Sequence, residues 1–246
     1  MNLLYAPRML VWFGYFFGYM ILHYAALRRG EKALEAGDLA TVRALVEKHI
    51  PHWCGVLLKI GGVTLEVEGQ ENIPAGRPCV FVANHRSLFD IPVMLTALGK
   101  PHGILAKQES EKIFLVNRWM KLLGCVFVQR DDVRASMKAL NAATETVKQG
   151  NSFSVFPEGT RSKGEEGKVA EFKGGAFRIA TKNKAPLVPV AFSGSRLIFE
   201  NNHYIVRNGV VRVSILPAIE TAELTREEQK ELPELTRRRI EAALQA

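Results

Sequence analysis

The stretch Asn84-His85-Arg86-Ser87-Leu88-Phe89-Asp90 predicts a strand, a turn and a helix at the centre of the fold. It follows a short apolar run, Val80 to Ala83, which is typical of a buried strand. Ser87 and Asp90 have the spacing of a capping box, so we expect a strand, a turn that carries His85, and then a helix. The turn lets Asp90 reach back to the imidazole, because in a continuous helix two residues five positions apart point about 140° away from each other.

A histidine held by a carboxylate can accept a proton near neutral pH, because the negative charge stabilises the imidazolium. The pair therefore predicts a general base. No protein nucleophile accompanies it, since the chain has no GxSxG, and Cys54, Cys79 and Cys125 lie in apolar stretches where burial raises a thiol pKa. We expect the base to take its proton from the substrate.

A second stretch, Phe156-Pro157-Glu158-Gly159-Thr160-Arg161-Ser162, follows another strand-like run that begins at Phe153. It combines a turn with a guanidinium group. Such a turn can present backbone N–H groups to an anion, and the guanidinium of Arg161 can meet phosphate oxygens with two parallel donors. The stretch predicts a phosphate-binding turn, and hence a phosphorylated alcohol as acceptor.

Outward from these stretches, β-like runs alternate with helical ones, which predicts an α/β fold with helices on the faces of the sheet. Loops at the strand ends of such folds carry the function. The expected strands are Val63 to Val67, Cys79 to Ala83, Ile104 to Ala106, Cys125 to Val128, Ser152 to Phe156, Leu187 to Ala191 and Val210 to Leu216. The expected helices are Ile91 to Leu98, Glu111 to Leu123, Arg134 to Lys148, Gly174 to Lys182 and a C-terminal helix after a Thr225/Glu228 capping box, interrupted by Pro233.

The N-terminal residues 9–27 contain no Asp, Glu, Lys or Arg and are rich in aromatic side chains. Their length just reaches that of a membrane span, but tyrosines and glycines dilute the segment, which favours seating in the membrane interface over a true span or a plain buried helix. A second helix is expected from Asp38 as N-cap to Leu58, interrupted near Pro51. We therefore predict a two-helix membrane-associating hairpin over residues 1–60 and a catalytic domain over residues 61–246.

The composition suits a globular domain with an anionic partner. The chain has 246 residues, 47% of them hydrophobic, and a net charge of +8. The charge alone does not choose between phosphate ligands, anionic lipid, an acidic carrier and nucleic acid. Three scattered cysteines argue for a reducing compartment and against a disulfide framework.

The sequence resembles the glycerolipid acyltransferases. The resemblance rests on four ordered blocks, which are the HxxxxD in NHRSLFD, Val126-Phe127-Val128-Gln129-Arg130, FPEGTRS and Leu187-Val188-Pro189-Val190. HxxxxD alone is a weak signal, but four blocks in order make coincidence unlikely. FPEGTRS followed by FKGGAF, residues 172–177, is most similar to bacterial 1-acyl-sn-glycerol-3-phosphate acyltransferases of the PlsC type.

The resemblance implies a glycerolipid-acyltransferase-like sheet flanked by helices and a role for each matched residue. His85 would be the base and Asp90 the residue that orients it. The implied substrate-binding residues are Lys107, Arg130, Glu158, Gly159, Thr160 and Arg161. The family's usual Ile-Asp-Arg reads Val128-Gln129-Arg130 here, so a neutral glutamine replaces the acidic residue.

The resemblance also implies a reaction. An acyl chain would pass from acyl-CoA or acyl carrier protein to the sn-2 hydroxyl of 1-acyl-sn-glycerol 3-phosphate, at the cytoplasmic face of the inner membrane. No acyl-enzyme would form, and no cofactor is expected beyond the acyl donor. The alternatives are a glycerol-3-phosphate or other lysophospholipid acyltransferase, and a membrane-binding homologue without catalysis.

Three other ligand classes are disfavoured. His49, His52 and Cys54 cluster in the sequence but have no fourth metal ligand nearby. The chain has no recognisable nucleic-acid reading element. It also lacks GxxxxGK[ST] and GxGxxG, so a nucleotide cofactor is unsupported.

Overall fold

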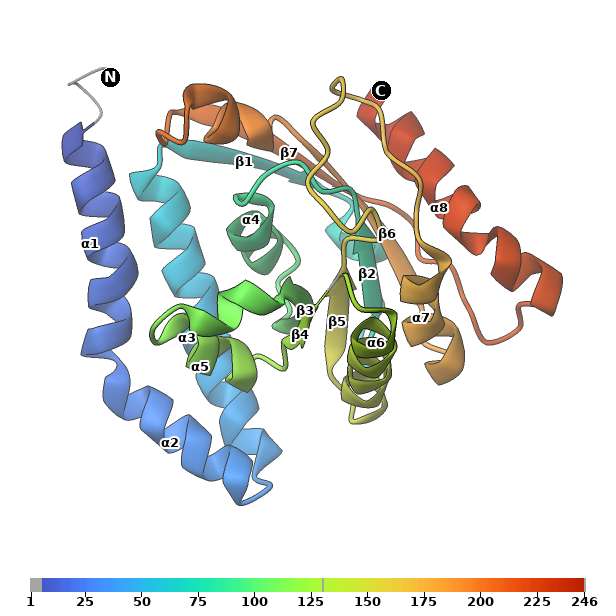
Figure 1. Ribbon diagram of the computed structural model, residues 1–246, viewed down its shortest axis with the longest axis horizontal. Helices are drawn as coiled ribbons and strands as arrows, with labels where there is room; N and C mark the ends of the chain where they lie inside the picture. The colour runs from blue at the N-terminus through green and yellow to red at the C-terminus, as the bar shows by residue number, and fades with distance from the viewer. Residues whose placement is uncertain (1–5, 130, 246) are drawn as a thin grey trace.

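A seven-stranded mixed sheet forms the centre of the computed structural model, which describes residues 6–129 and 131–245 (Figure 1). The strand order is β1-β7-β6-β2-β5-β3-β4. The strands are β1 Val63–Glu68, β2 Val80–Ala83, β3 His102–Lys107, β4 Val126–Val128, β5 Ser152–Val155, β6 Leu187–Ser193 and β7 Gly209–Ile215. Each expected strand is present, with bounds that differ by two residues or fewer at each end.

Five neighbouring strands run parallel and end at the same edge of the sheet. β2 pairs in parallel with β5 and β6, and β3 pairs in parallel with β5 and β4. β7 runs antiparallel to β6, and β1 is parallel to β7. The turn after β2 and the turn after β5 therefore lie side by side, because adjacent parallel strands deliver their carboxyl ends to one place.

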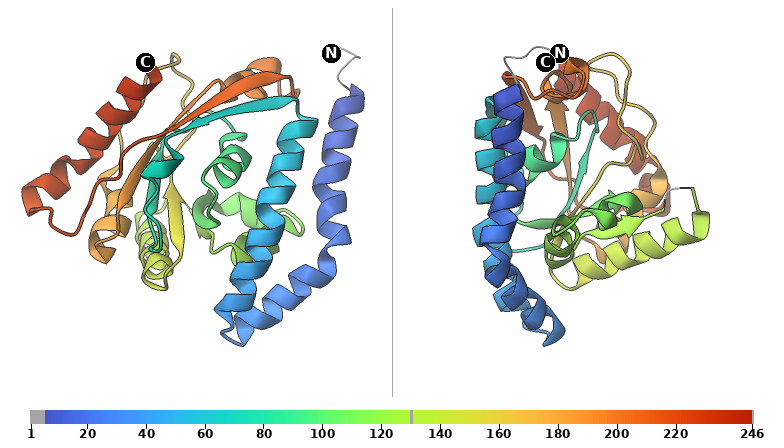
Figure 2. Two further views of the ribbon diagram at one scale, coloured as in Figure 1. Left: turned by 180° about the vertical axis from the view of Figure 1, so that it is seen from behind. Right: turned by 60° about the vertical axis from the view of Figure 1, so that its left-hand side comes forward.

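Helices cover both faces of the sheet, as the alternation along β2 requires. Phe81 and Ala83 belong to one hydrophobic cluster, while Val80 and Val82 belong to another. Successive side chains of a strand point to opposite faces, so a strand buried on both sides serves two cores. Figures 1 and 2 show the two layers, with α3, α4 and α5 on one side of the sheet and α6, α7 and α8 on the other.

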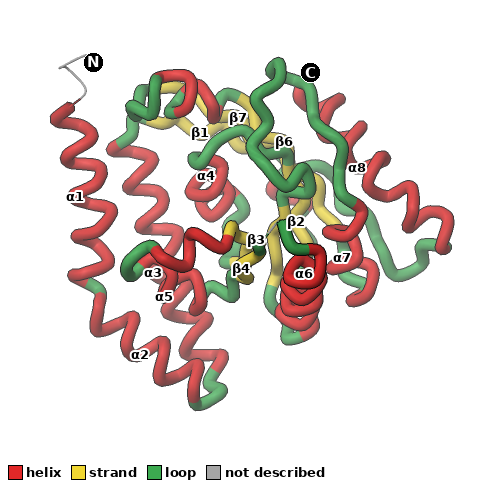
Figure 3. Tube along the Cα trace, viewed as in Figure 1, coloured by secondary structure: helices red, strands yellow, loops and turns green. Residues whose placement is uncertain are grey.

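The helices are α1 Ala6–Leu22, α2 Tyr24–Glu35, α3 Leu39–Ile60, α4 Asp90–Ala97, α5 Val116–Leu122, α6 Val133–Lys148, α7 Arg178–Asn183 and α8 Arg226–Gln245. Each helix expected after residue 60 has a counterpart, although α5 begins at Val116 where the sequence predicted Glu111, and the expected helix from Gly174 begins as a 3-10 turn. Short 3-10 helices lie at Gln70–Asn72, Gln108–Lys112, Gly174–Phe177, Ser195–Leu197 and Glu200–Asn202. Figure 3 shows in green the long loop that joins β5 to the helical turn before α7.

Two predicted helix interruptions are wrong. α3 continues through Pro51 and α8 continues through Pro233. Proline removes one backbone hydrogen bond from a helix interior, which favours a break in isolation. In α3, however, the flanking Ile50 and Cys54 are buried in the core, and in α8 Leu232 is buried, so tertiary packing holds both helices together.

The N-terminal segment forms three helices where the sequence predicted a two-helix hairpin. α1 and α2 meet at His23 with a bend of 54°. The bend carries α2 onto α5, where Glu31 accepts two hydrogen bonds from Arg118 at 2.6 and 2.7 Å. Gly30 packs against the side chain of Leu122 there. A straight continuation of α1 would forgo this contact with α5.

α1 has a packed face and an exposed apolar face. Trp12 donates from Nε1 to the carbonyl of Leu57 at 3.0 Å, and Trp53 donates from Nε1 to the carbonyl of Phe16 at 3.2 Å, which ties α1 to α3. The large exposed side chains of α1 are Leu10, Val11, Phe13, Phe17, Ile21 and Leu22. Among the described helices none is by itself long and apolar enough for a membrane span, whereas α1 and α2 taken together meet that criterion despite their bend.

The predicted boundary between residues 60 and 61 falls in the turn between α3 and β1. The N-terminal helices nevertheless share a hydrophobic cluster with the sheet, since Val46 and Ile50 of α3 belong to the same cluster as Phe81 of β2. The division into two domains stays a prediction.

Candidate active site

The carboxylate of Asp90 organises the turn that follows β2. Its Oδ2 atom accepts hydrogen bonds from Nδ1 of His85 at 2.8 Å, from the amide of Arg86 at 2.7 Å and from the amide of Ser87 at 2.8 Å. Asp90 is fully buried at the first position of α4, where the helix dipole also favours negative charge. The predicted strand, turn and helix are confirmed, and Asp90 reaches back to the imidazole as expected.

The contact with Asp90 determines which nitrogen of His85 carries the proton. An ionised carboxylate only accepts hydrogen bonds, so Nδ1 must be the donor, and Nε2 is left with the lone pair. The ring stacks on Phe156 with 4.1 Å between centroids and 19° between planes. The side chain is 11% exposed. The imidazole is thus oriented from two sides while one edge stays open, which is what a general base needs.

Glu158 braces the same turn from the neighbouring strand. Its Oε1 accepts from the amide of His85 at 2.6 Å, and its Oε2 accepts from the amide of Ala170 at 3.4 Å. Burial raises the pKa of Glu158, and the hydrogen bonds from these two amides oppose the rise. The carboxylate therefore shapes the backbone around His85. Its predicted contact with substrate stays a prediction.

Gly159 gives the turn after β5 its shape. Its φ of +73° lies in the left-handed region, which glycine adopts without strain. A Cβ atom at this position would lie 3.0 Å from Nζ of Lys173, so the side chain of Lys173 packs against the turn. Lys173 was not among the predicted site residues. Thr160 follows as an exposed residue. Gly159 sets the conformation of the turn and Thr160 faces solvent, and their predicted contact with substrate stays a prediction.

Arg161 lies beside the histidine turn, joined to it through Glu200. Its NH1 donates to Oε1 of Glu200 at 2.8 Å, and the same oxygen accepts from the amide of Leu88 at 2.9 Å. Oε2 of Glu200 accepts from the hydroxyl of Ser87 at 2.6 Å. The side chain of Arg161 is 38% exposed, so it is accessible from solvent while Glu200 ties it to the histidine turn.

Lys107 and Arg130 were the other predicted phosphate-binding residues. Lys107 ends β3, at the same edge of the sheet as His85, and is exposed beside Glu109 with 2.7 Å between Nζ and Oε1. This placement agrees with the expected position after a parallel strand. Arg130 lies outside the described residues.

Two further residues connect the motifs and were missed from the sequence. Arg86 is buried and donates to Oγ of Ser162, to the carbonyl of Glu165 and to the carboxylate of Glu166 at 3.4, 3.1 and 3.0 Å. Asn84 exchanges two hydrogen bonds with the backbone of Phe192 on β6. Both lie inside the NHRSLFD block, so their place in the block was the available signal.

Glu200 was missed for a different reason. It stands alone in the sequence, outside each of the four blocks. Only the fold brings it to the turns after β2 and β5.

The three thiols play no part in this arrangement. Burial raises the pKa of Cys54 and of Cys125 to about 12, and burial also raises the pKa of Cys79. A thiolate is the reactive form of cysteine, so these groups are poor nucleophiles. The burial of Cys54 and Cys79 agrees with the apolar surroundings expected for them, and Cys125 is partly buried.

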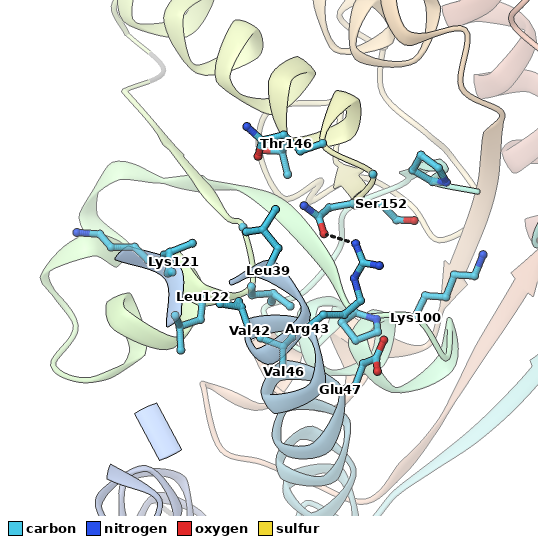
Figure 4. Close-up of a pocket in the computed structure, with 18 of the residues that line it drawn as sticks. Leu39, Val42, Arg43, Val46, Glu47, Lys100, Lys121, Leu122, Thr146 and Ser152 are labelled. Carbon is cyan, nitrogen blue, oxygen red and sulfur yellow. Dashed lines mark hydrogen bonds between the residues drawn. The ribbon is translucent and has the colours of Figure 1, made fainter. Parts of the chain in front are cut away.

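A cavity of about 370 Å³ lies at the other end of the sheet (Figure 4). Val42 and Val46 of α3 contribute apolar wall, and Lys100 and Ser152 mark the amino ends of β3 and β5. Lys100 donates to the carbonyl of Pro74, and Lys121 forms an ion pair with Glu111. These cations are already partnered, and the cavity does not include the residues of the His85 turn.

Comparison with known proteins places this geometry in a family. A family model described as Acyltransferase matches residues 64–193. A crystal structure of the 1-acyl-sn-glycerophosphate acyltransferase PlsC from Thermotoga maritima is similar with a TM-score of 0.75 and 32% sequence identity, and the match covers 96% of each chain.

Relatives by sequence carry related names. A probable 1-acyl-sn-glycerol-3-phosphate acyltransferase of Mycoplasma genitalium is 30% identical over 80% of this chain and 74% of its own length. A chloroplastic 1-acyl-sn-glycerol-3-phosphate acyltransferase of Brassica napus is 38% identical over 61% of this chain and 43% of its own length. The chain spans about half the length of four of the curated relatives that it matches, from 42% to 65%.

Proposed function

This chain belongs to the acyltransferase family, and on that premise we propose that it transfers a fatty acyl chain to the sn-2 hydroxyl of 1-acyl-sn-glycerol 3-phosphate. The product is phosphatidate, and the acyl donor is a thioester of coenzyme A or acyl carrier protein. The observation that carries the proposal is the 2.8 Å contact between Nδ1 of His85 and Asp90, in a turn tied through Glu200 to the guanidinium of Arg161.

The reaction begins with proton transfer to the histidine. Nε2 of His85 takes the proton of the acceptor hydroxyl while Asp90 stabilises the positive charge that develops on the ring. The alkoxide oxygen attacks the thioester carbonyl and forms the new C–O bond. When the C–S bond breaks, the thiolate leaves and the imidazolium returns the proton to sulfur, so that the enzyme ends neutral at Nε2.

Cationic side chains at the same edge hold the acceptor. Arg161 pairs with the phosphate, since a guanidinium meets phosphate oxygens with parallel donors. Lys107, the last residue of β3, adds positive charge at this edge. A contribution of Arg130 to phosphate binding stays a prediction. Holding hydroxyl and thioester together removes much of the entropic barrier, so binding of the phosphate contributes directly to the rate.

The exposed face of α1 seats the enzyme on its lipid substrate. Leu10 is 76% exposed, Phe13 45% and Phe17 37% on one side of this helix. Full burial of a large apolar side chain stabilises by about 1.5–3 kcal/mol, and each of these partly exposed side chains gains a share of that in the interface of a bilayer. This supports seating at a membrane surface, where both reactants keep their acyl chains near lipid, and our proposal places that surface on the cytoplasmic face of the inner membrane.

A four-way assay tests the proposed reaction. Purified protein is offered lysophosphatidate or glycerol 3-phosphate, each with acyl-CoA or acyl carrier protein as donor. Transfer to lysophosphatidate supports the proposal, whereas transfer to glycerol 3-phosphate alone would reassign the acceptor.

The catalytic assignment is tested with His85→Ala. The variant should lose at least about a hundredfold in kcat, because a general base contributes 10²–10⁴ in rate. Its binding to vesicles should stay intact. Unchanged transfer would reject His85 as the base.

Membrane seating is tested by flotation with vesicles that contain anionic phospholipid. The double variant Phe13→Ser/Phe17→Ser should bind at least about tenfold more weakly than the parent. Val133→Ser serves as the control, because Val133 is an apolar side chain that is 79% exposed on α6, on the other face of the sheet from α3. Equal binding of all three proteins to vesicles would show that α1 does not contact the membrane.

A further inference from the structure

Glu200 occupies a position that the reaction described above does not yet use. It lies in the segment between β6 and β7, drawn in orange in Figure 1, and its side chain is 8% exposed. Its carboxylate receives three donors within 2.9 Å, which are NH1 of Arg161, the hydroxyl of Ser87 and the amide of Leu88. The buried carboxylate of Glu200 therefore joins the turn after β2, which carries His85, to Arg161 in the turn after β5.

The segment that carries Glu200 is itself held in place. The ring of Phe199 packs on Phe89 with 5.6 Å between centroids. Arg196 donates from NH1 to the carbonyl of Ser162 at 2.7 Å, directly after Arg161. His203 and Tyr204 both adopt a positive φ, at 53° and 61°, and so close a tight turn after the short helix. These contacts hold the backbone of Glu200 in place, so its carboxylate can orient other groups.

We propose that Glu200 is a positioning residue for the acceptor, which sets the distance between the phosphate held by Arg161 and the hydroxyl that faces His85. The inference rests on the proposed function, since it concerns the phosphate of the same substrate. Glu200 acts through Arg161 and through the turn at Ser87 and Leu88, without touching the reacting atoms.

The chemistry of the guanidinium explains why a carboxylate serves here. Arg161 has five N–H donors in a planar fork, and the bond from NH1 to Glu200 determines the plane in which the remaining donors lie. The 38% exposure of the side chain leaves that fork accessible to a ligand. Without its partner the long side chain would sample several rotamers, and binding the phosphate would then have to order it.

If Glu200 repelled the phosphate of the acceptor, its removal would have the opposite effect on binding. A carboxylate beside a phosphate site repels the ligand by Coulomb's law, so if Glu200 merely competed with phosphate, removing its charge would tighten binding. If Glu200 positions Arg161, removing the charge weakens binding. The sign of the change therefore separates the two roles.

The experiment measures the kinetics of Glu200→Gln and Glu200→Asp with lysophosphatidate. Glutamine keeps the shape and removes the charge, while aspartate keeps the charge and is too short to reach both turns. In both variants we expect the KM for lysophosphatidate to rise about tenfold, as for a displacement of the order of 1 Å or less in a binding group. The KM for the acyl donor should stay unchanged.

A matched control removes an ion pair elsewhere. Glu66 pairs with Arg212 at 2.7 Å on the outer strands, so Glu66→Gln deletes the same kind of interaction away from the site. Its KM should equal that of the parent. A second control adds Glu200→Gln to Arg161→Ala and measures binding of lysophosphatidate without donor, where the second change should produce no further loss.

Each outcome decides the inference. A lower KM in Glu200→Gln, or a loss of melting temperature with unchanged KM, would overturn it. If the parent protein itself fails to use lysophosphatidate, the proposed function is at fault. If the parent is active and Glu200→Gln binds the acceptor equally well, only the role of Glu200 is lost.

Discussion

Two buried histidines lie at opposite ends of the parallel sheet and differ in what they can do. His85 follows the carboxyl end of β2, whereas His102 begins β3 at the amino end, and the whole residues are 8% and 1% exposed respectively. Nδ1 of His85 meets the carboxylate of Asp90, while Nδ1 of His102 meets the backbone carbonyl of Lys100 at 2.6 Å. Burial lowers the pKa of His102 to about 4.

The difference shows that burial alone does not make a base. His102 stays neutral at pH 7, and among the described residues its Nε2 has no hydrogen-bond partner. A neutral carbonyl cannot stabilise an imidazolium as a carboxylate does. The carboxyl end of the sheet supplies a charge partner and an open edge to its histidine, and the amino end supplies neither.

The largest test of this comparison removes the charge of Asp90. In Asp90→Asn we expect kcat to fall on the order of a thousandfold, because a neutral amide no longer stabilises the imidazolium and can favour the wrong tautomer of His85. Steady-state kinetics at pH 7 measure the effect. A kcat within a few fold of the parent would show that the two histidines differ for some other reason.

The second test concerns stability at acid pH. The folded pKa of His102, about 4, lies below the unfolded value of about 6.5. Between these two pH values the unfolded chain binds a proton at this histidine and the folded chain does not. The parent should lose up to about 3 kcal/mol of unfolding free energy from this group as the pH falls from about 6.5 to about 4.

The variant His102→Gln lacks this dependence. Urea unfolding of both proteins at several pH values measures the difference between their slopes, and parallel slopes would argue against a neutral buried histidine. At pH 7 the kcat of His102→Gln should stay within about threefold of the parent, in contrast with the loss expected at Asp90.

A third and smaller effect concerns Glu158, the second carboxylate at the carboxyl end. Glu158→Gln keeps an oxygen for the amide of His85, whereas Glu158→Ala leaves that buried donor unpaired at a cost of about 1–3 kcal/mol. Melting temperatures should therefore fall more in the alanine variant.

The pH dependence of Glu158→Gln has a definite sign. Burial raises the folded pKa of Glu158 above the unfolded one, so the stability that comes from its proton is present at low pH and is lost as the pH rises through the folded value. Glutamine does not titrate, so the stability of the variant relative to the parent should rise as the pH increases above about 4.5, the ordinary pKa of a glutamate. A constant difference would indicate that burial does not perturb this carboxyl.

Much of the site could be predicted because it is local. Residues 84–90 contain the base, its carboxylate and the turn that joins them, and the capping spacing of Ser87 and Asp90 indicated their geometry. The sheet could be predicted because β2 and β5 are short apolar runs that end in these motifs.

The rest depends on contacts that the sequence does not encode at short range. Glu200 reaches Ser87 and Arg161 only because β6 lies next to β2 in the sheet. The bend at His23 depends on the distant partner Arg118, and the continuity of helices through Pro51 and Pro233 depends on burial of their neighbours. Local rules for turns and prolines do not include such tertiary terms.

The smallest expected effect is a null result. Cys54 and Cys125, with pKa values raised to about 12, should not react with a thiol reagent in the folded protein, and all three cysteines should react in urea. Rapid labelling without denaturant would show that the core opens readily.

The pairing of the first strand has a consequence for synthesis on the ribosome. β1 stands at the edge of the sheet and hydrogen-bonds with β7 alone, whose last residue is Ile215. A nascent chain that stops before that point leaves its earliest strand without a neighbour, although the base and its carboxylate have long emerged. Truncated copies that end before β7 should therefore be digested by proteases faster than the complete chain.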